Sequence, residues 1–176
     1  MREVTALTNN RFLNIKQVKD PENNVFGYQF AERRGVDSIA FICKDKRTGM
    51  YLLNKEYTPP TNEFHIRAFG GSLDKAVDKM EIVRGELKEE AGFDGDIPIA
   101  ELGPMFVSTQ MNQYCYLYLA LVEKEKQGQR HPENAIEAMA QPVWLTMEEV
   151  INGSDWKAIS IIAKLTPEIE LRLLGY

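Results

Sequence analysis

The longest helical pattern in the chain, residues 73–90, lies among short runs of β-prone residues, and this order restricts the fold. Apolar residues recur there every three or four positions, as on one face of an α-helix. They are Leu73, Ala76, Val77, Met80, Val83 and Leu87. Strand-like runs precede and follow this stretch, and two helical patterns close the chain, each beginning after a residue suited to an N-cap, Thr146 and Asp155. The order predicts an α+β fold in which helices flank a mixed sheet in an α/β/α sandwich, rather than a regular doubly wound sheet.

Turn residues separate the strand-like runs. Residues 11–20 and 25–34 form an expected hairpin around Pro21, and residues 36–45 and 50–57 form another whose first arm is apolar enough to be central. Further strands are expected at 63–69, which Gly70 and Gly71 would end, and at 97–109, 113–124 and 140–147. Gly92 would end the main helix. We expect N-terminal strands in residues 1–36 and the main domain in residues 37–176.

Composition and charge limit the classes of partner. A chain of 176 residues can bury a real core in one domain. Its formal net charge of -5 and pI near 5.2 disfavour broad electrostatic binding to nucleic acid or to anionic lipid. If the protein binds phosphates, another source of positive charge is needed, and a divalent metal ion would supply it.

Apolar runs, the N-terminal residues and the two cysteines predict the compartment of the protein and the state of its thiols. No apolar run approaches the roughly 20 residues of a membrane span. The N-terminal residues do not resemble a secretory signal, so we expect a cytoplasmic protein. Cys43 and Cys115 each lie in an apolar run without a CxxC partner, which predicts buried thiols rather than a disulfide or a zinc site.

Three glutamates crowd the end of the predicted helix. Glu86, Glu89 and Glu90 fit an arc of about 100° beside the apolar stripe. Carboxylates are unfavourable there, because a helix C-terminus carries partial negative charge. Bound Mg²⁺ or Mn²⁺ would reverse that effect, since hard cations bind several carboxylate oxygens. The alternative is a solvated acidic helix end, partly offset by Lys88 and Arg84.

The spacing around these glutamates resembles the motif of the Nudix hydrolase family, G-x5-E-x7-R-E-U-x-E-E-x-G-U, in which U is a large apolar residue. The matching residues are Gly71, Glu86, Leu87, Glu89, Glu90, Gly92 and Phe93. Val77 replaces the first glutamate of the motif and Gly85 replaces its arginine, so the box is divergent. Arg84, one place early, is a candidate substitute for that arginine.

Beyond the motif, the chain is similar to the ADP-ribose pyrophosphatase branch of that family. Residues 51–74 resemble the strand, turn and strand that lead to the box, with Thr58 in place of an arginine. The resemblance implies a Nudix fold and metal-dependent hydrolysis of a nucleoside diphosphate linked to another group, X. ADP-ribose, cleaved to AMP and ribose 5-phosphate, is the leading substrate. The alternative is a Nudix-fold nucleotide sensor with weak or no hydrolysis.

The resemblance also implies roles for individual residues. Glu86, Glu89 and Glu90, with a backbone carbonyl at Gly70 or Gly71, would hold Mg²⁺ or Mn²⁺ against the diphosphate. The expected general base is Glu133, with Glu137 as the alternative in the same acidic loop. Arg67 and Gly71 are the expected substrate-binding residues, although Arg67 also suits an ion pair with Glu63. A homodimer formed through residues 10–35 is expected.

Overall fold

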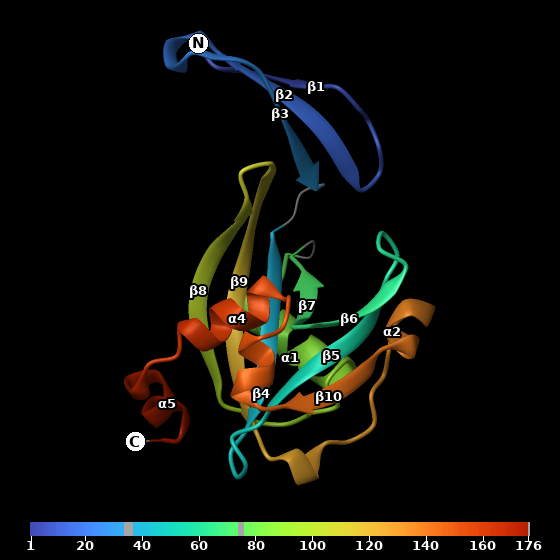
Figure 1. Cartoon of the computed structure of the whole chain (residues 1–176), viewed down its shortest axis with the longest axis vertical. Helices are drawn as coiled ribbons and strands as arrows, with labels where there is room; N and C mark the ends of the chain where they lie inside the picture. The colour runs from blue at the N-terminus through green and yellow to red at the C-terminus, as the bar shows by residue number, and fades with distance from the viewer. Residues whose placement is uncertain (34–36, 74–75, 176) are drawn as a thin grey trace.

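The computed structural model describes residues 1–33, 37–73 and 76–175 (Figure 1). The strands are β1 (Glu3–Ala6), β2 (Leu13–Asp20), β3 (Val25–Arg33), β4 (Ser38–Asp45), β5 (Tyr51–Thr58), β6 (Glu63–Arg67), β7 (Phe69–Ser72), β8 (Ile99–Ser108), β9 (Met111–Val122) and β10 (Gln141–Leu145). The α-helices are α1 (Lys79–Glu89), α2 (Ala135–Met139), α3 (Met147–Ile151), α4 (Trp156–Ala163) and α5 (Pro167–Leu173), and two 3₁₀ turns are η1 (Pro21–Asn23) and η2 (Lys124–Lys126).

The sheet is mixed, as the order of elements predicted. Strand β4 lies beside β9 in parallel register, from Ser38 opposite Cys115 to Asp45 opposite Val122. It pairs in antiparallel fashion with β5 and β7. The strand order is β1-β2-β3-β9-β4-β5-β10, with β6 on β5, β7 on β4 and β8 on β9. The expected central position of β4 is therefore confirmed.

Helices cover both faces of this sheet. Along β4, Ala40 and Ile42 belong to a core that includes α4, whereas Phe41 belongs to a core that includes α1. Alternate residues of a strand point to opposite faces, so an almost wholly apolar β4 requires cover on both sides. The two cores make the expected α/β/α sandwich, with α4 in front of the sheet in Figure 1.

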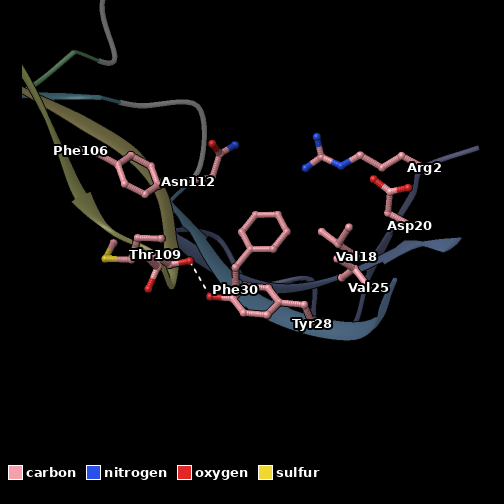
Figure 2. Close-up of a pocket in the computed structure, with 10 residues that line it drawn as sticks. Arg2, Val18, Asp20, Val25, Tyr28, Phe30, Phe106, Thr109 and Asn112 are labelled. Carbon is pink, nitrogen blue, oxygen red and sulfur yellow. Dashed lines mark hydrogen bonds between the residues drawn. The ribbon is translucent and has the colours of Figure 1, made fainter. Parts of the chain in front are cut away.

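The N-terminal strands form an antiparallel three-stranded unit at one end of the molecule (Figure 1). The hairpin of β2 and β3 was predicted, whereas β1 was not. One register pair joins β3 to β9, Ala31 opposite Met111. Figure 2 shows a cavity of about 350 Å³ beside this junction, where the Tyr28 hydroxyl donates to the Thr109 carbonyl at 2.7 Å. The expected domain boundary after residue 36 lies outside the described residues.

The predicted start of the main helix is wrong. The helix begins at Lys79 rather than Leu73, because the side chain of Asp78 accepts a hydrogen bond from the Met80 N–H and caps the first turn. Leu73 still packs against the core, but from an extended segment. Val77 is 47% exposed, whereas a residue on the core side of a longer helix would be buried. The end of the helix was predicted correctly, since Gly92 adopts a left-handed conformation with φ of 78°.

The expected strand at 63–69 is divided at Ala68. The Ala68 N–H donates to the Asp155 carboxylate at 2.7 Å, so the chain leaves β5 and continues as β7 beside β4. Gly70 and Gly71 therefore lie inside β7 instead of ending a strand. The apolar residues Phe64 and Ile66 of β6 are exposed, so this strand does not bury its apolar face.

The closing helices were predicted with their caps, and two shorter helices were not. Thr146 caps α3 and Asp155 caps α4, as expected. Helices α2 and α5 were not expected. Both cysteines are buried free thiols, as predicted. None of the described helices is both long and apolar enough to span a membrane.

Candidate active site

The C-terminal end of α1 presents the glutamate cluster beside β7. Val83 and Leu87 anchor the helix in the core, and the three carboxylates follow on the adjoining side. Glu90 is only 7% exposed, whereas Glu86 and Glu89 are half-buried. The expected position of the cluster, beside the apolar stripe, is what the structure shows.

Strand β7 brings its glycines against these carboxylates. Gly71 lies so close to Glu86 that a methyl group there would collide with the Glu86 carboxylate. The Gly70 N–H donates a hydrogen bond to Glu90. A larger residue in place of Gly71 would displace the Glu86 side chain, so this glycine allows the close approach.

Five glutamates surround a cavity of about 440 Å³ between α1, β7 and the segment that leads into α2. They are Glu81, Glu86, Glu89, Glu133 and Glu137, and we call this space the acidic cavity. No lysine or arginine of residues 1–33, 37–73 or 76–175 lines it. The structure thus brings the expected base Glu133, and its alternative Glu137, to the helix cluster. The backbone N–H of Glu133 donates to the Glu137 carboxylate at 2.7 Å.

Burial and neighbouring charge act together on Glu90. Burial, together with the carboxylates of Glu86 and Glu137, raises the pKa of its carboxyl group to about 8. The hydrogen bond from Gly70 opposes this effect but does not cancel it. A buried carboxyl group whose pKa is raised in this way, beside other carboxylates, is a candidate functional residue.

Arg130 ties the second acidic segment to the end of α1. Its guanidinium donates to the carbonyl oxygen of Glu90 at 2.6 Å, of Ala140 at 2.5 Å and of Glu137 at 3.1 Å. The His131 N–H donates to the Glu89 carbonyl at 2.8 Å. These bonds satisfy carbonyl groups that a helix end leaves unpaired, and they hold α2 beside the cluster. Sequence reasoning missed Arg130, because a single arginine in a polar loop carries no spacing signal.

A second cavity, of about 330 Å³, adjoins the first and shares Gly70, Gly71 and Ser72 with it. Its cationic lining residues are Arg33, Arg67 and Lys157, and we call it the basic cavity. The expected pairing of Arg67 with Glu63 is wrong: its guanidinium donates to Glu56 at 2.9 Å. The register explains this result, because Arg67 lies opposite Asn54 at the far end of β6 from Glu63.

The two departures from the motif are visible at the acidic cavity. Val77 and Gly85 both line it, and open space surrounds Gly85. Arg84 does not replace the missing arginine, because it points to Asp96, 4.0 Å away. The wall that carries Val77 and Gly85 therefore has no charged side chain at either position.

The donor chemistry of the acidic cavity fits a hard divalent cation. Carboxylate oxygens are the groups that Mg²⁺ and Mn²⁺ select, and five glutamates line the cavity without a described lysine or arginine. Within the described part of the chain, however, no three acidic, histidine or cysteine side chains are already gathered closely enough to hold a metal ion. The described residues suit a metal ion by type and charge, but in this structure their carboxylates do not yet surround one position.

Comparison of the sequence with family models and with curated proteins finds no match. Comparison of the structure finds the same fold in a solved protein described as "Crystal structure of ADP compounds hydrolase". The TM-score is 0.68 with 15% sequence identity, and the match covers 98% of this chain and 92% of that chain. This likeness confirms the expected fold class, an α+β fold built on a mixed sheet.

Proposed function

We propose that the protein is a metal-dependent pyrophosphohydrolase of nucleoside diphosphates linked to another group, X. The observation that carries the proposal is the acidic cavity, which five glutamates and the glycines of β7 line, together with the buried Glu90 beside the carboxylates of Glu86 and Glu137. The shared fold with an ADP compounds hydrolase supports the same reaction class. ADP-ribose, cleaved to AMP and ribose 5-phosphate, is the leading substrate.

Mg²⁺ or Mn²⁺ would be held by the carboxylates of Glu86, Glu89 and Glu90, with the Gly70 carbonyl as a further oxygen ligand. When bound, the ion supplies positive charge to the diphosphate oxygens and makes water a stronger acid. Gly71 lets the substrate lie close to the strand, because it presents no side chain. Arg67 faces the same shared strand from the basic cavity and offers guanidinium N–H groups to a phosphate.

The proton of the attacking water needs an acceptor among the residues of this chain. Glu133 is the proposed general base, because it lines the acidic cavity from the segment that leads into α2 and not from α1. Glu137 is the alternative, since its charge raises the pKa of Glu90 and its carboxylate accepts from the Glu133 N–H. Separate Glu133→Gln and Glu137→Gln variants decide between them: the base variant lowers kcat, while the other leaves the pH profile of kcat unchanged.

One observation favours a second function, nucleotide sensing without turnover. Val77 and Gly85 leave part of the cavity wall uncharged, and the described carboxylates have not converged around a metal position. A site of this kind would bind a nucleotide diphosphate while supporting little chemistry. The two functions share the fold and the ligand class, so only product formation separates them.

The test is an assay with Mg²⁺ and with Mn²⁺ against ADP-ribose, NADH, diadenosine polyphosphates, nucleotide sugars and capped RNA. The proposed function predicts AMP among the products of at least one adenine substrate, and loss of all products in EDTA. Binding of a nucleotide without products from any substrate identifies the sensor instead. Absence of both binding and products would contradict both functions.

We also propose a homodimer in which the N-terminal strands contact the second copy, with the main domain following residue 36. The supporting observation is the apolar surface of these strands, where Phe12 and Phe26 are each 68% exposed. Two further aromatic side chains of β3, Tyr28 and Phe30, line the cavity of Figure 2. Sedimentation should give twice the chain mass for the wild type, and Phe12→Ser with Phe26→Ser should give the monomer. A monomeric wild type at micromolar concentration contradicts this proposal.

A further inference from the structure

The basic cavity combines chemistry that the hydrolytic site does not explain. It adjoins residues 70–72 of β7, as the acidic cavity does, and its other walls include β9 and the first turn of α4. Three cations gather there in a chain whose formal net charge is -5. Glu56 is the acidic residue among its lining residues, so the local charge is opposite to that of the acidic cavity.

The three cations are held to different degrees. Arg67 donates to Glu56 at 2.9 Å, and Arg33 donates to the Ser72 hydroxyl at 2.7 Å. Lys157 forms no salt bridge with any residue in the described part of the chain. The two arginines are therefore pre-positioned at the cavity wall. Lys157 adds a positive charge that forms no ion pair within the described part of the chain.

A buried amide is a separate observation that indicates a ligand. Gln113 lines the basic cavity and is only 5% exposed, yet no hydrogen bond to its side chain is formed by the residues that the structure describes. Its neighbours on the same face of β9, Cys115 and Leu117, are buried apolar residues. An amide at a cavity wall that no described protein group engages is available to hydrogen-bond a polar ligand in that cavity.

We propose that the basic cavity is a phosphate subsite, so that preferred substrates carry a third phosphate besides the diphosphate that is hydrolysed. The substrate preference rests on the proposed function, because it assumes that the hydrolysed diphosphate lies in the acidic cavity. Guanidinium, ammonium and amide N–H groups together match the oxygens of a phosphate. A neutral sugar requires no such cations, whereas a phosphate in this cavity would meet donors from several of its lining side chains.

The first test measures anion binding without metal, using inorganic tripolyphosphate in EDTA and titration calorimetry. The acidic cavity repels this probe in the absence of metal, so binding there does not contribute to the signal. Lys157→Gln should weaken binding about tenfold, because one charge-assisted hydrogen bond is lost. Lys157→Arg should retain most of the affinity.

The matched control is Lys126→Gln, which removes an exposed lysine that pairs with Glu123 at 2.9 Å. It changes the net charge equally and should leave the affinity within about twofold of the wild type. No binding of tripolyphosphate by the wild type, or equal weakening by both lysine variants, overturns the phosphate subsite.

The second test compares matched substrates in Mn²⁺: ADP-ribose with its 2′-phosphate, and diadenosine diphosphate with diadenosine tetraphosphate. In at least one pair the wild type should prefer the member with more phosphates, and Lys157→Gln should reduce that preference about tenfold through KM. No preference in either pair overturns the substrate assignment. If no substrate is hydrolysed, the proposed hydrolase function fails, while the calorimetry still decides the subsite.

Discussion

The two cavities that share residues 70–72 differ in how their charge is balanced. The acidic cavity has five glutamates and no described lysine or arginine, whereas the basic cavity has three cations beside Glu56. The acidic cavity requires a cation from solution, and the basic cavity requires an anion. Residues 70–72, which carry no large side chain, adjoin both cavities, so a ligand with a metal-bound diphosphate and a further phosphate would satisfy both.

The largest effect should come from removing a carboxylate of the cluster. Glu86→Gln should lower kcat/KM about 1,000-fold, because metal-assisted charge stabilisation contributes several kcal/mol. Glu81→Gln is the matched control, since Glu81 lines the same cavity from the first turn of α1. Steady-state kinetics in Mn²⁺ measure both variants. Equal losses would mean that overall negative charge, and not the cluster, matters.

A methyl group on the shared strand should have the next largest effect. In Gly71→Ala the new Cβ would collide with the Glu86 carboxylate, which displaces a ligand and should lower kcat/KM about 100-fold. Gly85→Ala adds the same methyl group where nothing lies within 4 Å, and should stabilise α1 by about 1 kcal/mol. Kinetics and thermal unfolding distinguish them, and wild-type activity of Gly71→Ala would contradict the close approach.

A smaller effect is expected at the arginine that holds the two acidic segments together. Arg130→Ala removes three hydrogen bonds to carbonyl groups and should lower kcat about tenfold by releasing α2. Arg130→Lys should recover only part, because one ammonium group cannot replace the planar fork. Arg84→Ala, whose ion pair is exposed, should change stability by less than about 0.5 kcal/mol. Unchanged kcat in Arg130→Ala would show that α2 needs no such restraint.

A pH dependence of stability, measured by unfolding and not by turnover, is expected in the metal-free protein. Folding raises the pKa of Glu90 from 4.5 to about 8, so the folded state binds more protons between these values and stability falls as pH rises from about 5 to 8. Urea unfolding in EDTA should show this decline, and Glu90→Gln should flatten it. A decline of equal slope in the variant would assign it to other groups.

The sequence predicted the parts of the fold that depend on local pattern. Almost continuous apolar residues identified β4 as central, and Thr146 and Asp155 identified two helix starts. The motif spacing placed Glu86 and Glu90 beside the glycines, and the structure brings them together. Their role as metal ligands stays a prediction.

Other features depend on contacts between distant residues. The helical period continued through Val77, but the cap at Asp78 delayed the helix. The division of β6 from β7 depends on Asp155, which lies 87 residues from Ala68 along the chain. The basic cavity likewise combines residues from β3, β6 and α4, and no local pattern connects these segments.

The most direct test of the central claim compares the wild type with Glu90→Gln on ADP-ribose in Mn²⁺, with the products identified by chromatography. We predict AMP and ribose 5-phosphate from the wild type, no products in EDTA, and a rate at least about 100-fold lower for the variant. Equal rates for the two proteins, or undiminished hydrolysis by the wild type in EDTA, would contradict a metal-dependent reaction at the acidic end of α1.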